Sequence, residues 1–253
     1  MSIEGRNEAK MLFRKLFVVR KCIKCRRPMD VKDFENAFCP ECREKYLKAK
    51  MAICPECSLE ANNCRCLPKL LAKDKIIALR RVFFYSKEHS IEPQNKLIYF
   101  LKANKSRRVG RFAAGELYLL LRSELSALDD IGDKKPIIVS IPRSRDSLIR
   151  YGFDQSALVS RELSSISGFE YCELFRRRRG KAQKSLTAGE RRKNIKSSLY
   201  INEREAMKIR GRIVVLIDDV VTTGASMSAC AQLLYECGAK NILCIAIASD
   251  IKS

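Results

Sequence analysis

The segment VVLIDDVVTTGAS, residues 214–226, joins two adjacent carboxylates to a run of small and hydroxyl-bearing residues. Four apolar residues, typical of a buried strand, precede Asp218 and Asp219. A loop that leads from a strand into a helix N-terminus can bind an anion, because its amides point outward and the helix dipole favours negative charge. The residues expected to hold a phosphate in this way are Thr222, Thr223, Gly224, Ala225 and Ser226.

The two carboxylates would repel a phosphate that they touched, so they are expected to bind something beside it, such as sugar hydroxyls or a metal ion. A ligand with a phosphate beside two neighbouring hydroxyls is a ribose 5-phosphate. Two alternatives compete. An apolar run followed by acids also occurs in the magnesium-binding strand of P-loop NTPases, but residues 110–117 come nearest to the required loop and carry Glu116 where lysine is needed. The other alternative is an ordinary buried strand with surface acids.

Cysteines make the second candidate site. Eight of the twelve lie between residues 22 and 66. CxxC turns direct two thiolates at one centre, and two such turns complete the tetrahedron that Zn²⁺ prefers. The spacing favours two sequential sites, although a single site with spare thiols and an interleaved pairing stay open. The first group is Cys22, Cys25, Cys39 and Cys42, and the second, which closes with a tighter C-x-C, is Cys54, Cys57, Cys64 and Cys66.

A site of four thiolates leaves no open position for water or substrate, so the expected zinc is structural. A redox role for the CxxC turns is disfavoured because no βαβ pattern flanks them. The other four cysteines lie in apolar patterns that indicate core positions: Cys172, Cys230, Cys237 and Cys244. His89 is the only histidine, which disfavours catalysis by a Cys–His or Ser–His–Asp group.

The net charge of +21 on 253 residues indicates an anionic partner, which could be nucleic acid, a phosphorylated ligand or a membrane surface, although a solvated basic surface would give the same total. No apolar run approaches the ~20 residues that span a bilayer, so no membrane insertion is expected. Charges interrupt each apolar stretch of the N-terminal segment, which disfavours a secretion signal and favours a cytoplasmic protein.

The elements that must position these residues follow from hydrophobic periodicity. Apolar runs predict strands, amphipathic patterns predict helices, and their alternation predicts a mostly parallel sheet with helices on both faces. Ligands bind such sheets beyond the carboxyl ends of the strands, where the loops 142–147 and 218–226 are expected. The predicted strands are 76–86, 137–141, 212–219 and 241–249, and the predicted helices are 95–108, 109–128, 155–167 and 226–239. The expected organisation is a lead-in at 1–20, a cysteine-rich zinc-ribbon module at 21–70, and an α/β domain at 76–253.

Three blocks of the sequence resemble a known family. VVLIDDVVTTGAS resembles the motif of type I phosphoribosyltransferases that binds phosphoribosyl pyrophosphate (PRPP). Residues 140–163, SIPRSRDSLIRYGFDQSALVSREL, and residues 181–196, KAQKSLTAGERRKNIK, are similar to two further blocks of the ComF family. Members of this competence-associated family join a zinc ribbon to a phosphoribosyltransferase-like domain, and the resemblance covers about residues 20–250.

The resemblance implies a type I phosphoribosyltransferase fold that binds PRPP with Mg²⁺. Asp218 and Asp219 would bind the ribose hydroxyls or a Mg²⁺ ion near them, and residues 222–226 would hold the 5-phosphate. The residues in the place of the pyrophosphate loop are Pro142, Arg143, Ser144 and Arg145. Segment 176–196 would be a mobile hood whose Lys184 or Arg191 could reach the pyrophosphate.

The sequence departs from the family pattern before the GF-[ND]-Q motif. Tyr151 stands where the family usually has arginine, and Asp154 replaces the common asparagine. The role of that arginine is therefore in doubt here. Arg150, Phe153 and Gln155 have a plain alternative interpretation as the entry to a helix and its packing.

Two functions remain after these arguments. One is a phosphoribosyltransferase whose acceptor the sequence does not reveal. The other is a non-catalytic module that reuses this fold to bind single-stranded DNA in transformation or DNA processing, or to bind a partner. The resemblance implies a helicase-like competence protein as that partner. The basic runs at 105–108 and 176–181 suit either, whereas the intact acid pair favours ligand binding. The chain has no tryptophan, and its other aromatics fall mostly at core spacing, which weakens the DNA hypothesis.

Overall fold

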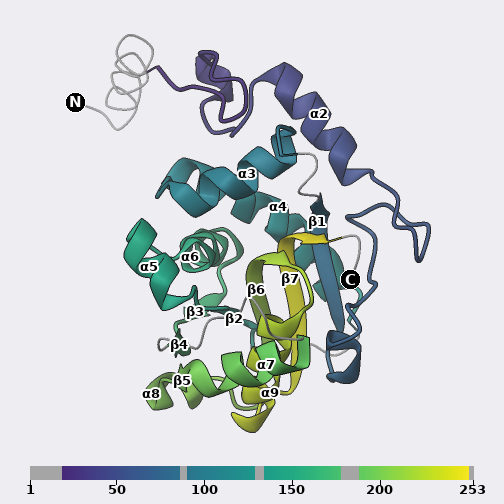
Figure 1. The fold of residues 1–253 in the computed structure, drawn as a ribbon, viewed down its shortest axis with the longest axis vertical. Helices are drawn as coiled ribbons and strands as arrows, with labels where there is room; N and C mark the ends of the chain where they lie inside the picture. Colours follow the sequence, from purple (N-terminus) through teal and green to yellow (C-terminus); the bar gives the residue numbers. More distant parts are fainter. Residues whose placement is uncertain (1–18, 86–89, 129–133, 178–187, 251–253) are drawn as a thin grey trace.

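A computed structural model describes residues 19–85, 90–128, 134–177 and 188–250, with the side chains of 188–191 left out. Its centre is a five-stranded sheet in the order β1-β7-β6-β2-β3 (Figure 1). Every neighbouring pair in this sheet is parallel, which confirms the prediction from alternating strands and helices. The strands are β1 (Ala78–Tyr85), β2 (Ile137–Ser140), β3 (Glu170–Cys172), β6 (Ile213–Val221) and β7 (Asn241–Asp250).

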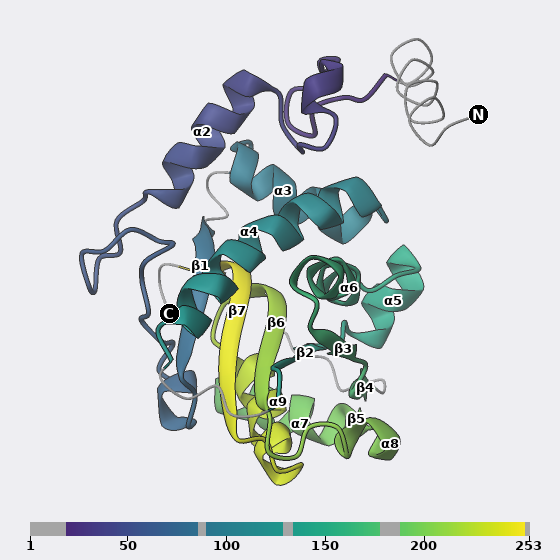
Figure 2. The ribbon, with the colours of Figure 1, turned by 180° about the vertical axis from the view of Figure 1, so that it is seen from behind.

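Helices cover both faces of the sheet (Figures 1 and 2). On one face the buried side chains of the strands join those of α3 and α4 and the first cysteine group in one cluster, and α6 packs there too. On the other face they pack against α9, which α7 covers in turn. These helices are α3 (Pro93–Ala103), α4 (Arg107–Ser126), α6 (Gln155–Ser167), α7 (Ala188–Ser198) and α9 (Ala225–Glu236).

Several predicted boundaries moved for local reasons. The predicted helix 95–108 ends at Ala103, because Asn104 is extended and Ser106 begins α4 as an N-cap that accepts from the amide of Val109. Gly168 ends α6 at φ 72°, as predicted. The strand predicted to stop at Asp219 continues to Val221, since its last residues still pair with β7. Both carboxylates therefore lie inside the strand rather than at its end.

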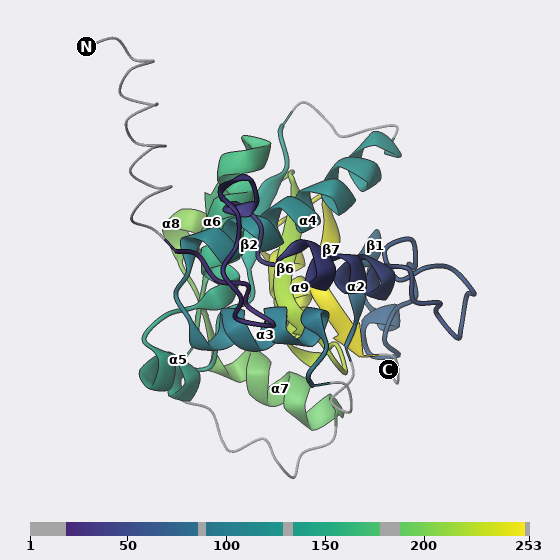
Figure 3. The same cartoon turned by 90° about the horizontal axis from the view of Figure 1, so that it is seen from above.

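Some short elements were not predicted from the sequence (Figure 3). The most relevant is a two-stranded antiparallel sheet of β4 and β5, which frames the segment that the resemblance assigns to the hood. The others lie in the cysteine-rich region or between the larger elements. The bounds are η1 (Val31–Asp33), α2 (Pro40–Lys50), η2 (Leu71–Lys73), α5 (Arg145–Tyr151), β4 (Phe175–Arg177), β5 (Leu199–Ile201) and α8 (Glu203–Ala206).

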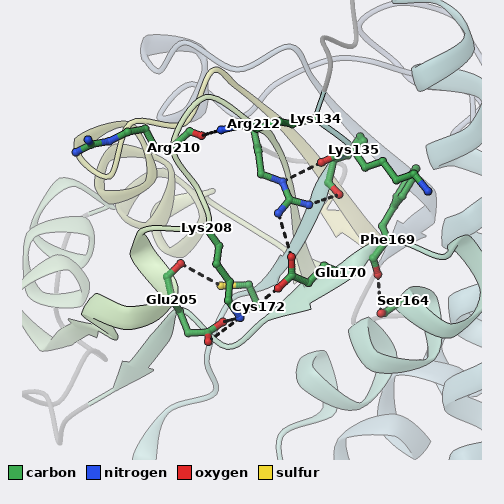
Figure 4. A network of polar contacts seen from close by, with 11 residues as sticks. Lys134, Lys135, Ser164, Phe169, Glu170, Cys172, Glu205, Lys208, Arg210 and Arg212 are labelled. Atoms are coloured by element: carbon green, nitrogen blue, oxygen red, sulfur yellow. Dashed lines mark hydrogen bonds and ion pairs between the residues drawn. The ribbon is translucent and has the colours of Figure 1, made fainter.

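The amino ends of three strands are tied together by a polar network (Figure 4). The Arg212 guanidinium, just before β6, donates to the Glu170 carboxylate at 3.0 Å and to the Lys135 carbonyl at 2.9 Å. Lys208 pairs with Glu170 at 3.1 Å and with Glu205 at 2.9 Å. This network joins the amino ends of β2, β3 and β6, and the backbone pairing of these strands sets the register of their carboxyl ends at the opposite edge.

Candidate functional site

The carboxyl ends of β2 and β6 border a cavity of about 430 Å³. A smaller hollow of about 100 Å³ adjoins it and shares Asp218, Val220 and Ser226 with it. The loop predicted to bind phosphate lines the smaller hollow, and the loop after β2 lines the larger one. The larger cavity is lined by Lys102, Ile141, Pro142, Arg143, Ser144, Ser147, Arg150, Tyr151, Gln155, Ser156, Arg177, Asp218, Asp219, Val220 and Ser226.

Adjacent residues of a strand point to opposite faces, so Asp218 and Asp219 face different layers. Asp219 is 8% exposed and faces the α3 and α6 side. Its carboxylate accepts a hydrogen bond of 3.0 Å from the Gln155 side chain and pairs with the Lys102 ammonium at 3.4 Å. Gln155 therefore contacts the acid pair directly, which the packing interpretation of this residue does not explain.

Asp218 lies on the α9 side and lines both hollows. Burial, and then the charge of Asp219, raise the pKa of Asp218 well above the ordinary value. Its Oδ1 accepts from the Asp219 amide at 2.8 Å, which partly offsets this effect. A cation or a pair of hydroxyl donors placed at Asp218 would favour the ionised carboxylate.

The phosphate-type loop, residues 222–226, has the geometry that the sequence predicted. Gly224 adopts φ 74° and is the N-cap of α9. Its carbonyl accepts the first helical hydrogen bond, from the Ser228 amide at 2.8 Å. The first amides of a helix have no intrahelical acceptor, so α9 directs donors toward the smaller hollow. The loop can therefore offer amides and hydroxyls to one anion.

The loop after β2 is held by Asp154, one of the two departures from the family pattern. Asp154 caps α6 by accepting from the Ala157 amide at 3.0 Å, and its second oxygen accepts from the Arg143 amide at 2.7 Å. Burial raises the pKa of Asp154 above its usual range, and the amides oppose that rise. An asparagine has only one acceptor oxygen, whereas both oxygens of Asp154 are used here.

Tyr151, the second departure, lies under the Arg143 guanidinium. The guanidinium carbon is 4.3 Å from the centre of the Tyr151 ring and 5.6 Å from that of Phe153. Arg143 also donates to the carbonyls of Phe153 at 3.2 Å and Lys102 at 3.0 Å. The tyrosine thus positions a cation that the preceding loop supplies, and Arg150 lines the same cavity.

Most of the predicted site residues are brought together at this edge. Pro142, Arg143 and Ser144 share the larger cavity with both acids, whereas Arg145 lines a separate cavity behind Pro142. Lys184 lies outside the described residues. Arg191 belongs to α7, but its side chain also lies outside them.

Sequence reasoning did not single out four basic or polar residues of the cavity: Lys102, Ser147, Ser156 and Arg177. Lys102 lies at the end of α3, 117 positions before Asp219, the acid with which it pairs. No local pattern marks such a contact. The P-loop alternative has no support, because residues 110–117 lie inside α4.

The cysteines form two knuckles of the same design. In the first, an antiparallel bridge joins Lys21 to Pro28, and in the second another joins Ile53 to Glu60. Each CxxC turn ends in a residue with positive φ, which is Arg26 at 64° and Ser58 at 57°. Their amides donate to the carbonyls of the first cysteine of each turn, at 3.0 Å and 2.9 Å respectively.

The four sulfur atoms of each sequential group lie within 4.8 Å of one another, which agrees with the pairing that the spacing favours. Zn–S bonds of ~2.3 Å in a tetrahedron place sulfurs about 3.8 Å apart. The Cys25 and Cys39 sulfurs are 3.6 Å apart, and those of Cys54 and Cys66 are 3.9 Å apart. Both groups therefore fit a zinc ion.

In each group the pKa of the first thiol is lowered, whereas burial raises the pKa of the last two. Burial raises the pKa of Cys22, but amides of the two knuckle halves outweigh it and lower this pKa to about 7. At Cys54 burial also raises the pKa, but hydrogen bonds led by the amides of Cys57 and Glu56 outweigh it and lower this pKa to about 7. Thiolates are the form that binds zinc. Of the four cysteines predicted to be core residues, Cys172, Cys230 and Cys244 are buried, whereas Cys237 is only partly buried.

Comparison with known proteins agrees with this fold. Residues 122–253 match the family described as Phosphoribosyl transferase domain. The chain belongs to this family.

Among curated proteins, the chain is 30% identical over 229 residues to DNA utilization protein YhgH of Escherichia coli K12, covering 86% of this chain and 92% of that protein. It is 29% identical to Competence protein F of Haemophilus influenzae, covering 88% and 93%. It is 25% identical to Competence protein ComFC of Streptococcus pneumoniae, covering 88% and 96%. The resemblance to the ComF family is thereby confirmed.

None of the helices among the described residues is long and apolar enough to cross a bilayer.

Proposed function

We propose that the cavity at the carboxyl edge of the sheet binds PRPP together with Mg²⁺. Residues 222–226 hold the 5-phosphate, and Asp218 and Asp219 face the ribose hydroxyls or the metal. The loop of Pro142, Arg143 and Ser144 faces the pyrophosphate. The observation that carries this proposal is the convergence of an acid pair, an amide-rich loop and a basic loop on adjoining hollows.

The charges around the cavity suit such a ligand. Lys102, Arg143, Arg150 and Arg177 line it together with the two acids. Pyrophosphate and 5-phosphate carry several negative charges, whereas the ribosyl carbon becomes positive as its bond to pyrophosphate breaks. Cations and carboxylates that line one cavity can therefore stabilise both charges that develop in the transition state.

The reaction class that follows is pentosyl transfer. The bond between ribose C1 and pyrophosphate breaks with both electrons leaving on pyrophosphate, and a nucleophile forms a new bond to C1. Carboxylate oxygens are the ligands that Mg²⁺ prefers, and the ion would supply neutralisation of the pyrophosphate. Asp218 and Asp219 fit this role by their chemistry. We propose Lys184 and Arg191 as further cations of a hood that covers the leaving group.

The test is calorimetric titration of the zinc-loaded protein with PRPP and Mg²⁺. The Asp218→Asn/Asp219→Asn double variant is expected to lose binding. Asp146→Asn is the matched control, since Asp146 lies in the first turn of α5 and does not line the cavity. Failure of the native protein to bind PRPP would remove the proposed function.

A second candidate rests on a net charge of +21 and on relatives named for DNA utilization and competence. In this second candidate function, the protein is cytoplasmic. It binds single-stranded DNA and a helicase-like competence protein, with or without PRPP. Several phosphate contacts would make DNA affinity fall by ~10³-fold or more between 50 and 200 mM salt. Titration of a labelled single strand at both salt concentrations measures this, and a flat salt response would exclude it.

A further inference from the structure

The phosphate-type loop rests on a segment that belongs to the N-terminal part of the chain. We call residues 67–74, which lead from the second cysteine group toward β1, the brace. It contains η2, a single turn in which the Pro68 carbonyl accepts from the amides of Leu71 at 2.8 Å and Ala72 at 3.0 Å. This turn directs the Leu71 side chain inward, where it is fully buried.

The contact between Leu71 and Gly224 is close. A Cβ atom added to Gly224 would lie 2.7 Å from the Leu71 Cγ and 2.9 Å from its Cδ1, and 3.4 Å from the Pro68 Cβ. Real Cβ atoms do not approach other atoms to 2.7 Å. The backbone of the loop is therefore seated directly on this leucine, with no room for a larger residue.

Two more contacts join the brace to α9, the helix that begins at this loop. Leu70 packs with Ala225 and Ala229 of α9. The Asp74 carboxylate accepts a hydrogen bond of 3.2 Å from the Gln232 side chain, two turns further along α9. The brace thus supports the loop and the helix together.

The other end of the brace is fixed at the second cysteine group. Cys64 and Cys66 immediately precede it, and the Cys66 carbonyl accepts from the guanidinium of Arg81, a residue of β1 that is 3% exposed. This charge offsets part of the −2 that four thiolates and a zinc ion carry. Only Leu67 separates the last thiol from Pro68, so the second cysteine group and the brace adjoin along the chain.

We propose that the brace makes the second cysteine group a support of the phosphate-type loop, with Leu71 as the positioning residue. Loss of metal from this group frees residues 64–66, moves Leu71 and loosens Gly224 and the start of α9. The ligand consequence rests on the proposed function, since a loose loop binds a 5-phosphate weakly. The structural consequence stands whether or not PRPP is the ligand.

The first cysteine group makes the natural comparison. Its buried residues pack on the α3 and α4 face of the sheet, where Phe38 meets Phe112 at a ring distance of 5.7 Å. The brace and the loop belong to the opposite side of the sheet. Disturbance of the first group is therefore expected to leave the loop unchanged.

The test is hydrogen exchange of the ligand-free, zinc-loaded protein, followed on peptides that cover residues 222–230. Leu71→Ala is expected to speed exchange in these peptides about tenfold or more, because opening of the helix start becomes easier. Leu121→Ala is the matched control, since Leu121 is also fully buried but lies in α4. Equal effects of the two variants on these peptides would overturn the proposal.

A second arm tests the link to the metal. Cys57→Ser in the second group is expected to raise loop exchange, and Cys25→Ser in the first group is not, with zinc content measured for both. Loop exchange that follows the first group, or neither group, would contradict the link. If Cys57→Ser does not fold, the comparison of Leu71→Ala with Leu121→Ala still tests whether Leu71 positions the loop. Absence of PRPP binding would remove the proposed function but leave both exchange results interpretable.

Discussion

Substitution of Gly224 by alanine tests the packing of the phosphate-type loop most sharply. Two separate costs are expected. A non-glycine residue at φ 74° costs about 1–2 kcal/mol. The new Cβ would also lie 2.7 Å from Leu71, and such overpacking of a core costs typically about 1–3 kcal/mol. The free energy of unfolding should therefore fall by about 2–5 kcal/mol in total.

A second glycine separates the two costs. Gly168 has φ 72°, and an added Cβ there would meet no atom within 4 Å. Gly168→Ala should thus lose only the conformational part, and the excess loss in Gly224→Ala should be about 1–3 kcal/mol. In a Leu71→Ala background the excess should disappear, because the clashing atoms are gone.

The assay is denaturant unfolding of the zinc-loaded protein for three single variants, Gly224→Ala, Gly168→Ala and Leu71→Ala. The two double variants combine Leu71→Ala with each glycine substitution. A coupling between positions 71 and 224 of about 1 kcal/mol or more is expected, as for residues in direct contact. Equal losses for the two glycine variants, or additive effects at 71 and 224, would refute the seating of the loop on the leucine.

Three further predictions follow from single residues. Burial and the nearby Asp219 raise the pKa of Asp218, so its favourable contribution to stability is complete below its unfolded pKa of about 4 and is lost as pH rises through the folded pKa. Asp218→Asn should therefore stabilise the ligand-free protein by about 0.5–2 kcal/mol at pH 7, with a smaller gain at pH 4; equal gains in denaturant melts would contradict this. Tyr151→Ala should release the Arg143 guanidinium and weaken PRPP affinity about fivefold in calorimetry, whereas Tyr151→Phe should bind normally, and equal affinities of the two variants would argue against the stacking role. Arg26→Gly should raise the unfolding free energy by about 0.5–1 kcal/mol, because φ is 64° there; a loss of stability in thermal unfolding would show that the side chain matters more than the backbone.

The sheet could be predicted from the sequence because its signals are local. The buried runs of β6 and β7 are apolar on both faces, as in a parallel strand covered by helices. The end of β6 was misplaced, since the acids at 218 and 219 look like a strand boundary. The continued pairing of Val220 and Val221 with β7 is a tertiary property.

The candidate site likewise combines residues that a local pattern marks with residues that only the tertiary fold brings in. Residues 218–226 and the loop after β2 form contiguous motifs, so the sequence located them. Lys102 and Arg177 reach the cavity from a helix end and a short strand whose positions depend on the whole fold. The brace could not be predicted either, because nothing in residues 67–74 shows that Leu71 packs under Gly224, 153 positions later.

The most direct test of the central claim is a crystal structure of the zinc-loaded protein grown with PRPP and Mg²⁺. The account predicts the 5-phosphate against the amides and hydroxyls of residues 222–226, with Asp218 and Asp219 at the ribose hydroxyls or the metal. The pyrophosphate should lie beside the loop of residues 142–144. A ligand phosphate bound elsewhere, with residues 222–226 empty at saturating PRPP, would contradict the account.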